Sequence, residues 1–313
     1  MTVVVLRAGL QVTIQSSPRL GQRHLGVPAS GPADPLSMAL ANRLVGNDPM
    51  APALEVTLSG LSVCFEAPAD IAITGANATV ELGGHAASMH RTLSAGAGDE
   101  LHIGPAEQGA RVYIAFAGGL VAEEILGSGS TYIPAGLGGH HGRALAREDR
   151  LSIHKVQRTV GKLETPPEFR PRMTTSWGFR ACDAAETGQL QHREQLFDTN
   201  FAVSNRCDRM GMMLEGPRLQ VESAGRMPSA PVFPGTVQCP EDGRPFMLSV
   251  DAQTTGGYPR VAQVARVDRH LLGQLRPGDH IRLLWRNEQS AIEELRAKID
   301  YWRGWLSKAE AVI

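Results

Sequence analysis

The chain has 313 residues, more than one hydrophobic core usually holds, and its length therefore predicts two domains. Its 31 Lys and Arg residues nearly balance 32 Asp and Glu residues, so no broad electrostatic field attracts nucleic acid or an anionic membrane. No apolar run reaches the roughly eighteen residues of a membrane span, and the four cysteines lack the CxxC spacing of a zinc site or a disulfide framework. We therefore expect a cytoplasmic protein whose partners are small molecules and other proteins.

The first predicted element is a strand at the start of the chain. The run MTVVVLRAGL is apolar but short, carries no basic leader and continues into polar residues, so it is typical of a strand and not of a signal peptide. A helix is predicted next over residues 34–45, because Asp34 can cap its first turn and Pro35 suits the first helical position.

Later segments alternate β-branched or aromatic residues with polar ones and predict further strands. They are residues 55–65, 70–74, 112–117, 246–250 and 280–285. The tail, residues 287–308, is predicted as an amphipathic helix, because apolar residues recur there at steps of three or four. These residues are Ile292, Leu295, Ile299, Trp302 and Leu306.

One pattern occurs three times, an acidic turn followed by an alternating strand. It appears as AGDELHI (97–103), REDRLSI (147–153) and PGDHIRL (277–283). Such turns suit closed or nearly closed sheets, so we predict a mainly β fold of two barrel-like lobes with few short helices. The predicted domains are a first lobe over residues 1–158, a connecting segment over 159–196, a second lobe over 197–286 and the C-terminal helix within 287–313.

Several catalytic signatures are absent from the sequence. There is no GxxxxGK[ST] phosphate loop, no glycine fingerprint in a βαβ context, and no HExxH or HxE with CxxC. The string GSGSTY (127–132) matches the GxSxG elbow only superficially, because its second glycine stands at the wrong offset. These absences argue against dinucleotide oxidoreduction, serine hydrolysis and a resident metal.

The richest polar segment is DAQTTGGYPR, residues 251–260. Gly256 and Gly257 are predicted to adopt backbone conformations closed to other residues and to let a ligand approach closely. Donors and acceptors beside them come from Asp251, Gln253, Thr254 and Tyr258. The segment is therefore predicted to form a wall of a ligand site, and the alternative is a hairpin whose polar groups satisfy only the turn.

A second wall is predicted at SGPAD, where Ser30 and Asp34 precede a helix N-terminus that favours carboxylate or phosphate. Asp34 can equally be nothing more than the helix cap. Asn42 and Asn47 follow in the helix and just past it, where each can bind a ligand or anchor a loop.

Arg111 and Arg209 are candidates for anion contact, with a salt bridge, for instance to Asp208, as the alternative. Gln238 lies near Pro240. Its side chain can form hydrogen bonds with a ligand amide such as a lactam or a urea, or it can make a strand-edge hydrogen bond. Cys239 is expected to be a small buried apolar residue, since no base accompanies it.

Seven segments together resemble the second-subunit half of the biotin-dependent carboxyltransferase family. They are residues 26–47, 53–60, 111–120, 126–132, 208–217, 235–264 and 275–283. That family includes the C-type subunits of 5-oxoprolinase, the allophanate hydrolase subunit 2 type proteins, the carboxyltransferase region of urea carboxylase and an antagonist of a sporulation kinase inhibitor. The resemblance implies cyclophilin-like β-barrels, a partner subunit of related fold and a ligand cleft between them.

The resemblance implies one main function and two alternatives. The first is ATP- and magnesium-dependent opening of 5-oxoproline to glutamate, together with a B-type partner subunit similar to allophanate hydrolase subunit 1. The second is carboxyl transfer to urea or a similar amide from carboxybiotin carried on a separate chain, and the third is a non-catalytic regulatory binding subunit. A homo-oligomer is a further possibility for its assembly.

The predicted site residues fall into two groups under this resemblance. Catalytic roles are predicted for Asp34, Arg209, Gln238, Thr254 and Tyr258. Substrate or nucleotide binding is predicted for Ser30, Asn42, Asn47, Arg111, Asp251, Gln253, Gly256 and Gly257.

The sequence also departs from the family pattern. The resemblance implies arginines where Gly129 and Ala252 stand, and a Gly-Asp turn where this chain has Glu148 and Asp149. Because arginine suits bidentate carboxylate or phosphate binding, the two losses predict altered anion recognition.

Overall fold

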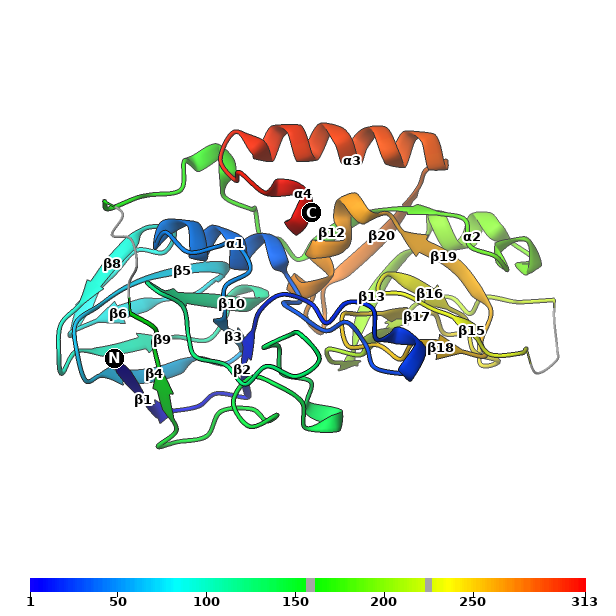
Figure 1. The fold of residues 1–313 in the computed structure, drawn as a ribbon. Coiled ribbons are helices and arrows are strands. Elements are labelled where there is room, and N and C mark those ends of the chain that lie inside the picture. Colours follow the sequence, from blue (N-terminus) through cyan, green and yellow to red (C-terminus); the bar gives the residue numbers. More distant parts are fainter. Residues whose placement is uncertain (156–160, 223–226) are drawn as a thin grey trace. The chain divides into compact units, whose positions relative to one another are not determined.

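The computed structural model describes residues 1–155, 161–222 and 227–313, which divide into two compact units (Figure 1). The first unit comprises Met1–Arg19, Ser30–Met173 and Trp302–Val312, and the second comprises Leu20–Ala29, Thr174–Tyr301 and Ile313. Within these ranges, no helix combines the length and the apolar composition needed to cross a membrane.

The first unit consists of two antiparallel sheets. The six-stranded sheet has the order β11 (Arg150–Ser152), β1 (Thr2–Arg7), β4 (Leu61–Phe65), β9 (Glu100–Ile103), β6 (Val80–Leu82) and β7 (His85–Ala86). The five-stranded sheet has the order β2 (Gln11–Gln15), β3 (Ala53–Thr57), β10 (Gln108–Phe116), β5 (Ala69–Asn77) and β8 (Thr92–Ala95).

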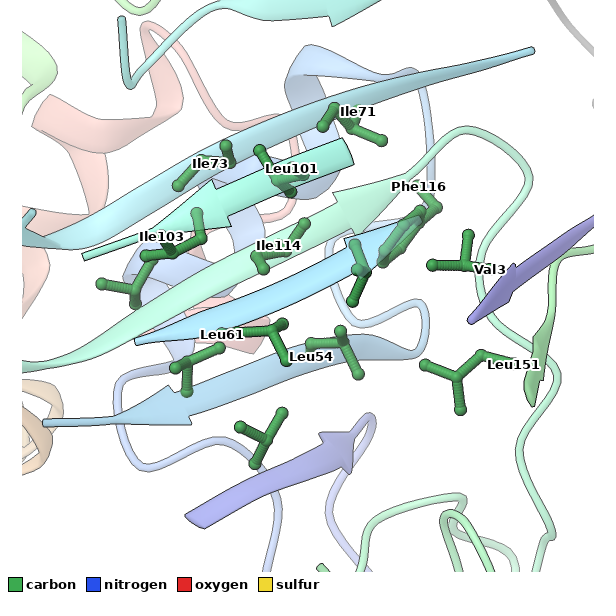
Figure 2. Close-up of a cluster of buried hydrophobic side chains, with 14 of the residues drawn as sticks. Val3, Leu54, Leu61, Ile71, Ile73, Leu101, Ile103, Ile114, Phe116 and Leu151 are labelled. Carbon is green, nitrogen blue, oxygen red and sulfur yellow. The ribbon is translucent and has the colours of Figure 1, made fainter. Parts of the chain in front are cut away.

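Apolar side chains from both sheets form one core between them (Figure 2). Val3, Leu61 and Leu101 come from the first sheet, and Leu54 and Ile114 from the second. All five are fully buried. Since burying each such side chain contributes about 1.5–3 kcal/mol, this core is the main source of stability for the two sheets.

Helix α1 (Pro35–Leu44) covers the other face of the five-stranded sheet. Its buried residues Met38 and Leu44 pack in one cluster with Tyr113, which alternates along β10 with the core residue Ile114. Asp34 caps the helix by accepting a hydrogen bond at 3.1 Å from the Ser37 backbone N–H. Such a cap is worth about 1 kcal/mol. The predicted helix and its cap are confirmed.

The second unit contains a closed barrel. Its strand order is β12 (Ser176–Cys182), β19 (Arg260–Val264), β16 (Thr236–Gln238), β17 (Phe246–Leu248), β14 (Gly211–Glu215), β13 (Asn200–Cys207) and β20 (His280–Trp285). A short ribbon of β15 (Ala230–Pro231) and β18 (Thr255–Gly256) stands apart from it. The predicted mainly β, barrel-like fold is confirmed.

Short helices connect the strands. They are α2 (Arg193–Asp198) and the 3-10 helices η1 (Arg23–Leu25), η2 (Ile133–Ala135), η3 (Pro167–Phe169), η4 (Thr187–Gln189) and η5 (Arg266–Gln274).

The predicted strand over residues 55–65 is wrong in one respect, because the structure divides it into β3 and β4. Leu58 has a left-handed backbone with φ of 55°. A Cβ at Gly60 would lie 1.8 Å from the Ile103 carbonyl oxygen. The chain therefore turns between the two strands, and β3 and β4 belong to different sheets.

The predicted tail helix is also shorter than expected. Helix α3 spans Glu288–Arg303 and is followed by α4 (Ala309–Val312). The predicted apolar stripe is buried only at its end, since Ile292 is 44% exposed whereas Trp302 is 6% exposed. The Trp302 ring packs on Phe169 with centroids 5.5 Å apart.

The three repeated turns share one hydrogen-bond pattern. An aspartate carboxylate accepts from the backbone N–H three residues earlier: Asp99 from Gly96 at 2.6 Å, Asp149 from Ala146 at 2.7 Å and Asp279 from Arg276 at 3.3 Å. The residue before each aspartate is left-handed, with φ of 87° at Gly98, 72° at Glu148 and 89° at Gly278. Glu148 thus occupies a position that favours glycine.

We predict that Glu148→Gly raises the free energy of unfolding by about 0.5–1 kcal/mol. The left-handed conformation costs a non-glycine residue about 1–2 kcal/mol, which exceeds the added flexibility of glycine in the unfolded chain. Urea denaturation measures the change. The matched control is Gly98→Glu, where no atom lies within 4 Å of the added Cβ, and it should lose a similar amount. A destabilised Glu148→Gly variant would contradict this prediction.

Truncation after Arg286 is expected to cause aggregation or a change in oligomer size. It removes Trp302, Leu306 and Val312, which are all buried, and exposes the apolar surface that they cover. Light scattering measures the mass. Ile292→Lys in the full chain is the control and should stay monodisperse, because Ile292 is already exposed. Unchanged mass and solubility after truncation would contradict the prediction.

Candidate functional site

A pocket of about 570 Å³ lies against the barrel of the second unit. Three of its residues form a row across neighbouring strands, because Gln238 on β16 pairs with Phe246 on β17, and Phe246 pairs with Met213 on β14. The preceding or following residues, such as Val237 and Met247, are fully buried. Since side chains alternate along a strand, the row points out of the barrel wall and forms the pocket floor.

The remaining lining residues come from two loops and the end of one strand. The turn between β16 and β17 contributes Pro240, Glu241, Asp242 and Arg244, the segment after β17 contributes Gln253 and Tyr258, and the end of β13 contributes Arg206. A volume of this size suits a small ligand.

Two side-chain amides meet in the pocket. The Gln238 Oε1 accepts from the Gln253 Nε2 at 3.4 Å, and the Gln238 Nε2 donates to the Tyr258 carbonyl at 3.3 Å. Gln238 lies on β16 and is 1% exposed, so its side chain is enclosed by its neighbours. Each amide has two N–H groups and a carbonyl, which leaves further donors and acceptors for a ligand. The structure therefore brings together three predicted residues, Gln238, Gln253 and Tyr258.

The predicted backbone conformation of the two glycines is wrong, whereas the close approach of a ligand to them stays a prediction. Neither Gly256 nor Gly257 adopts the left-handed conformation. A Cβ at Gly256 would lie 2.5 Å from the Gln238 Nε2, whereas one at Gly257 would lie 3.4 Å from its nearest neighbour, the Met227 carbonyl. The missing side chain of Gly256 therefore leaves room for the Gln238 amide, and its backbone conformation is not one that favours glycine.

A buried ion pair anchors the start of this segment. The Arg209 Nε lies 2.7 Å from the Asp251 Oδ2, and the side chains are 6% and 4% exposed. A second contact, Nη2 to Oδ1, measures 3.1 Å. Asp208, expected as the alternative partner, instead accepts from the backbone N–H groups of Met210 and Gly211. The two predicted residues Arg209 and Asp251 thus anchor the start of the segment, and neither lines the pocket.

Arg23 supports the same segment further along, and the sequence analysis missed it. Its Nη2 donates to the carbonyls of Val232 and Thr254, the latter at 3.4 Å. Its guanidinium lies 4.8 Å from the Phe233 ring centroid, and burial lowers its pKa. Thr254 is 8% exposed, and its carbonyl also accepts from the Val232 N–H at 3.1 Å. The contacts of Thr254 therefore place it in the scaffold of the segment.

Arg260 anchors the C-terminal end of the segment. It makes a bidentate pair with Glu186, and its Nη1 donates to the Pro231 carbonyl at 3.3 Å. The hydrogen bonds with Glu186 raise the pKa of Arg260. Three arginines thus hold residues 251–260 in place.

The predicted residues of the first unit lie in a buried polar network. The Tyr113 hydroxyl donates to the Glu55 Oε2 at 2.7 Å and accepts from the Asp34 N–H at 2.7 Å. Burial, and then the charge of Glu55, raises the pKa of Tyr113 well above its usual value. The Arg111 Nε lies 3.3 Å from the Glu55 Oε1. Arg111 therefore forms the salt bridge given as its alternative, and Asp34 caps α1.

The two predicted asparagines anchor loops. The Asn42 Nδ2 donates to the Pro49 and Ala51 carbonyls, and the Asn47 Nδ2 donates to Asn42 and to the Phe116 carbonyl. Ser30 is 3% exposed and left-handed, and among the residues that the structure describes its hydroxyl has no hydrogen-bond partner.

Ligand binding by the five first-unit residues, and their convergence with the second-unit residues in one cleft, stay predictions. These five are Ser30, Asp34, Asn42, Asn47 and Arg111.

The two positions at which the family resemblance implied an arginine, Gly129 and Ala252, do not line this pocket. Ala252 is 2% exposed and packs with Val232 and Leu248, and a Cβ at Gly129 would lie 2.9 Å from the Ala122 Cβ. The positive charge of the pocket comes instead from Arg206 and Arg244, which the sequence analysis missed. The signal for them was the density of charged residues in SNRCDR (204–209) and in PEDGRP (240–245), the latter directly before the predicted strand over residues 246–250.

Cys239 is confirmed as a buried residue. It is 1% exposed, and burial, followed by the charge of Asp242, raises the pKa of its thiol to about 11. The thiol is therefore neutral at physiological pH and cannot act as a thiolate nucleophile. In the described parts of the chain, no group of three or more His, Cys, Asp or Glu residues is placed to hold a metal ion.

Comparison with known proteins places the chain among a group of enzymes. A family model described as carboxyltransferase domain, subdomain A and B, matches residues 25–285. The chain is 35% identical to the C-type subunit of 5-oxoprolinase from Escherichia coli over 304 residues, covering 96% of this chain and 95% of that protein. It is 32% identical to urea amidolyase of Saccharomyces cerevisiae over 296 residues, covering 88% of this chain and 16% of that protein.

The fold is also similar to a solved structure. The crystal structure of Kluyveromyces lactis urea carboxylase superposes with a TM-score of 0.91 at 26% identity, covering 98% of this chain and 29% of that chain. The chain thus corresponds to less than a third of that larger enzyme.

Asp251→Asn is expected to lower the free energy of unfolding by about 3–5 kcal/mol, because it leaves the buried Arg209 guanidinium without its carboxylate. Chemical denaturation followed by tryptophan fluorescence measures the loss. The matched control is Asp198→Asn, which breaks a pair with Arg282 whose carboxylate side chain is 73% exposed and should cost about 0–1 kcal/mol. Equal losses in the two variants would show that the buried pair does not anchor the segment.

Proposed function

Because the chain belongs to the family of carboxyltransferase domains with subdomains A and B, we propose that it is a subunit of an ATP-dependent 5-oxoprolinase. In this role it opens 5-oxoproline to glutamate together with a related B-type partner subunit. The observation that carries the proposal is the similarity to the C-type 5-oxoprolinase subunit of Escherichia coli, which extends over nearly the whole of that relative.

The pocket of the second unit supports the proposal chemically. A lactam has one N–H donor and one carbonyl acceptor, and the Gln238 and Gln253 amides offer the complementary groups side by side. Phe246 and Met213 supply an apolar floor for the methylene groups of the ring. The pocket therefore suits a small cyclic amide.

The reaction needs no nucleophile from this chain. In this reaction ATP phosphorylates the amide oxygen and leaves as ADP, which weakens the C–N bond. One water adds to the activated carbon as the C–N bond breaks and the ring nitrogen takes up a proton, and a second water then releases the phosphate to leave the carboxylate. Such chemistry depends on positioning and on charge stabilisation. The buried Gln238 amide, which donates to the Tyr258 carbonyl, and the neutral thiol of Cys239 agree with that requirement.

The nucleotide is not assigned to this pocket. Its two arginines are offset by Glu241 and Asp242, whereas a triphosphate requires an excess of positive charge. These residues therefore do not fit ATP, and no step involving ATP is derived for them.

Carboxyl transfer to urea from carboxybiotin is the second candidate function. The similarity in fold to urea carboxylase favours it, and urea is also an amide that Gln238 can recognise. In that case the biotin is carried by another chain.

The assay compares both functions in one preparation. The chain is purified with its B-type partner, and ATP hydrolysis and product formation are measured with 5-oxoproline, urea and allophanate in parallel. We expect turnover of 5-oxoproline, and Gln238→Leu should lower kcat/KM by about 10- to 100-fold because a buried amide contact is lost. The control is Gln220→Leu, an exposed glutamine outside the pocket, which should leave the rate unchanged.

Two other results would replace the proposal. Turnover of urea that depends on carboxybiotin, with none of 5-oxoproline, would favour the carboxyltransferase function. Binding of the partner without turnover of any of the three substrates would favour a regulatory subunit.

A further inference from the structure

The charged side chains that line the pocket differ in whether they form ion pairs. Asp242 is shared by two arginines, since its Oδ2 lies 3.7 Å from the Arg244 Nε and 3.6 Å from the Arg218 Nη1. Arg244 also contacts the Met213 sulfur at 3.8 Å. In contrast, Arg206 makes no ion pair within the described ranges of the chain. Arg206 is therefore the pocket arginine that is available to an anionic ligand.

A bulge in β13 directs Arg206 to the pocket. Val203 pairs with Leu214 and Cys207 pairs with Met212, so residues 204–206 lie opposite the single residue Met213. The Arg206 N–H donates to the Ser204 hydroxyl at 3.0 Å, which holds the bulge. Bulges re-aim side chains relative to a regular strand.

The register of the barrel sets the distance between the two polar ends of the pocket. Gln238, Phe246 and Met213 occupy successive strands, and Arg206 follows on the next strand. Three strand spacings correspond to about 14 Å between the outer backbones. The Gln238 and Arg206 side chains extend from these ends over an apolar floor, so a small molecule can contact both.

We propose that Arg206 binds the carboxylate of a small cyclic amide whose lactam group lies against Gln238 and Gln253. This inference rests on the proposed function and identifies the residue that selects 5-oxoproline over uncharged amides. A guanidinium forms two parallel hydrogen bonds with a carboxylate, which fixes the orientation of the ring as well as its charge.

The charge balance of the pocket favours a single carboxylate. The lining contains two arginines, Arg206 and Arg244, and two acidic residues, Glu241 and Asp242, so the formal charges cancel. A phosphate or polyphosphate would meet two acidic side chains without a surplus of positive charge. A molecule with one carboxylate and a neutral amide needs only the unpaired guanidinium of Arg206 and the two glutamines.

The experiment removes the carboxylate from the ligand and the guanidinium from the protein. Calorimetry on the purified chain with its partner measures Kd for 5-oxoproline and for 2-pyrrolidinone, the same ring without the carboxylate. Arg206→Gln should weaken 5-oxoproline binding by about 10- to 100-fold and leave 2-pyrrolidinone unchanged. Arg206→Lys should keep part of the preference, because it retains the charge but not the bidentate geometry.

Two further variants separate this result from a general disturbance. Gln238→Leu should weaken both ligands, because both contain the lactam. Arg282→Gln removes an arginine of the same unit that pairs with Asp198 outside the pocket and should weaken neither.

The inference is overturned if Arg206→Gln weakens both ligands equally, if it weakens neither, or if the wild type binds neither. Failure of the proposed function gives a different pattern. In that case the variants still discriminate between the two ligands, but the wild-type complex with ATP does not convert 5-oxoproline to glutamate.

Discussion

The candidate site depends on the ion pair between Arg209 and Asp251. Both side chains are almost fully buried, so both charges have lost most of their contact with water, and the Arg209 guanidinium makes two contacts with the Asp251 carboxylate. The pair fixes the start of the segment that carries Gln253 and Tyr258. Arg23 and Arg260 hold the middle and the end, through carbonyls and through Glu186. A segment rich in glycine and hydroxyl groups is therefore held by charged side chains along its length and by the short β15–β18 pairing.

The same barrel strands contribute side chains to the hydrophobic core and to the pocket. Val237 and Met247 face the interior and are fully buried, while their neighbours Gln238 and Phe246 face outwards and form the pocket floor. Because the side-chain period of a strand is two, stability and recognition are assigned to alternate residues. The outward row is covered by the segment after β17, where Gly256 allows the backbone to approach the Gln238 amide.

The chemistry of the pocket is that of recognition and positioning. The thiol of Cys239, next to the pocket residue Gln238, is neutral, the Gln238 amide donates to the Tyr258 carbonyl, and the acidic and basic side chains of the pocket lining balance. In the proposed function, such a site holds an amide in a defined orientation while a second component supplies the reactive phosphate or carboxyl group. Both functions suggested by the relatives, lactam opening and carboxyl transfer, require an amide held in this way.

The sequence by itself determined the mainly β class, helix α1 with its Asp34 cap and the strand β20, because local alternation, capping residues and glycine turns act over a few neighbouring positions. It also identified Gln238, Gln253 and Tyr258 as polar residues near turns. Only the tertiary structure decided that Arg209 pairs with Asp251 instead of Asp208, that the Gln238 amide lies against Gly256, and that Arg206 lines the same pocket. These facts depend on strand register and on contacts between residues far apart in the chain, which local sequence patterns do not encode.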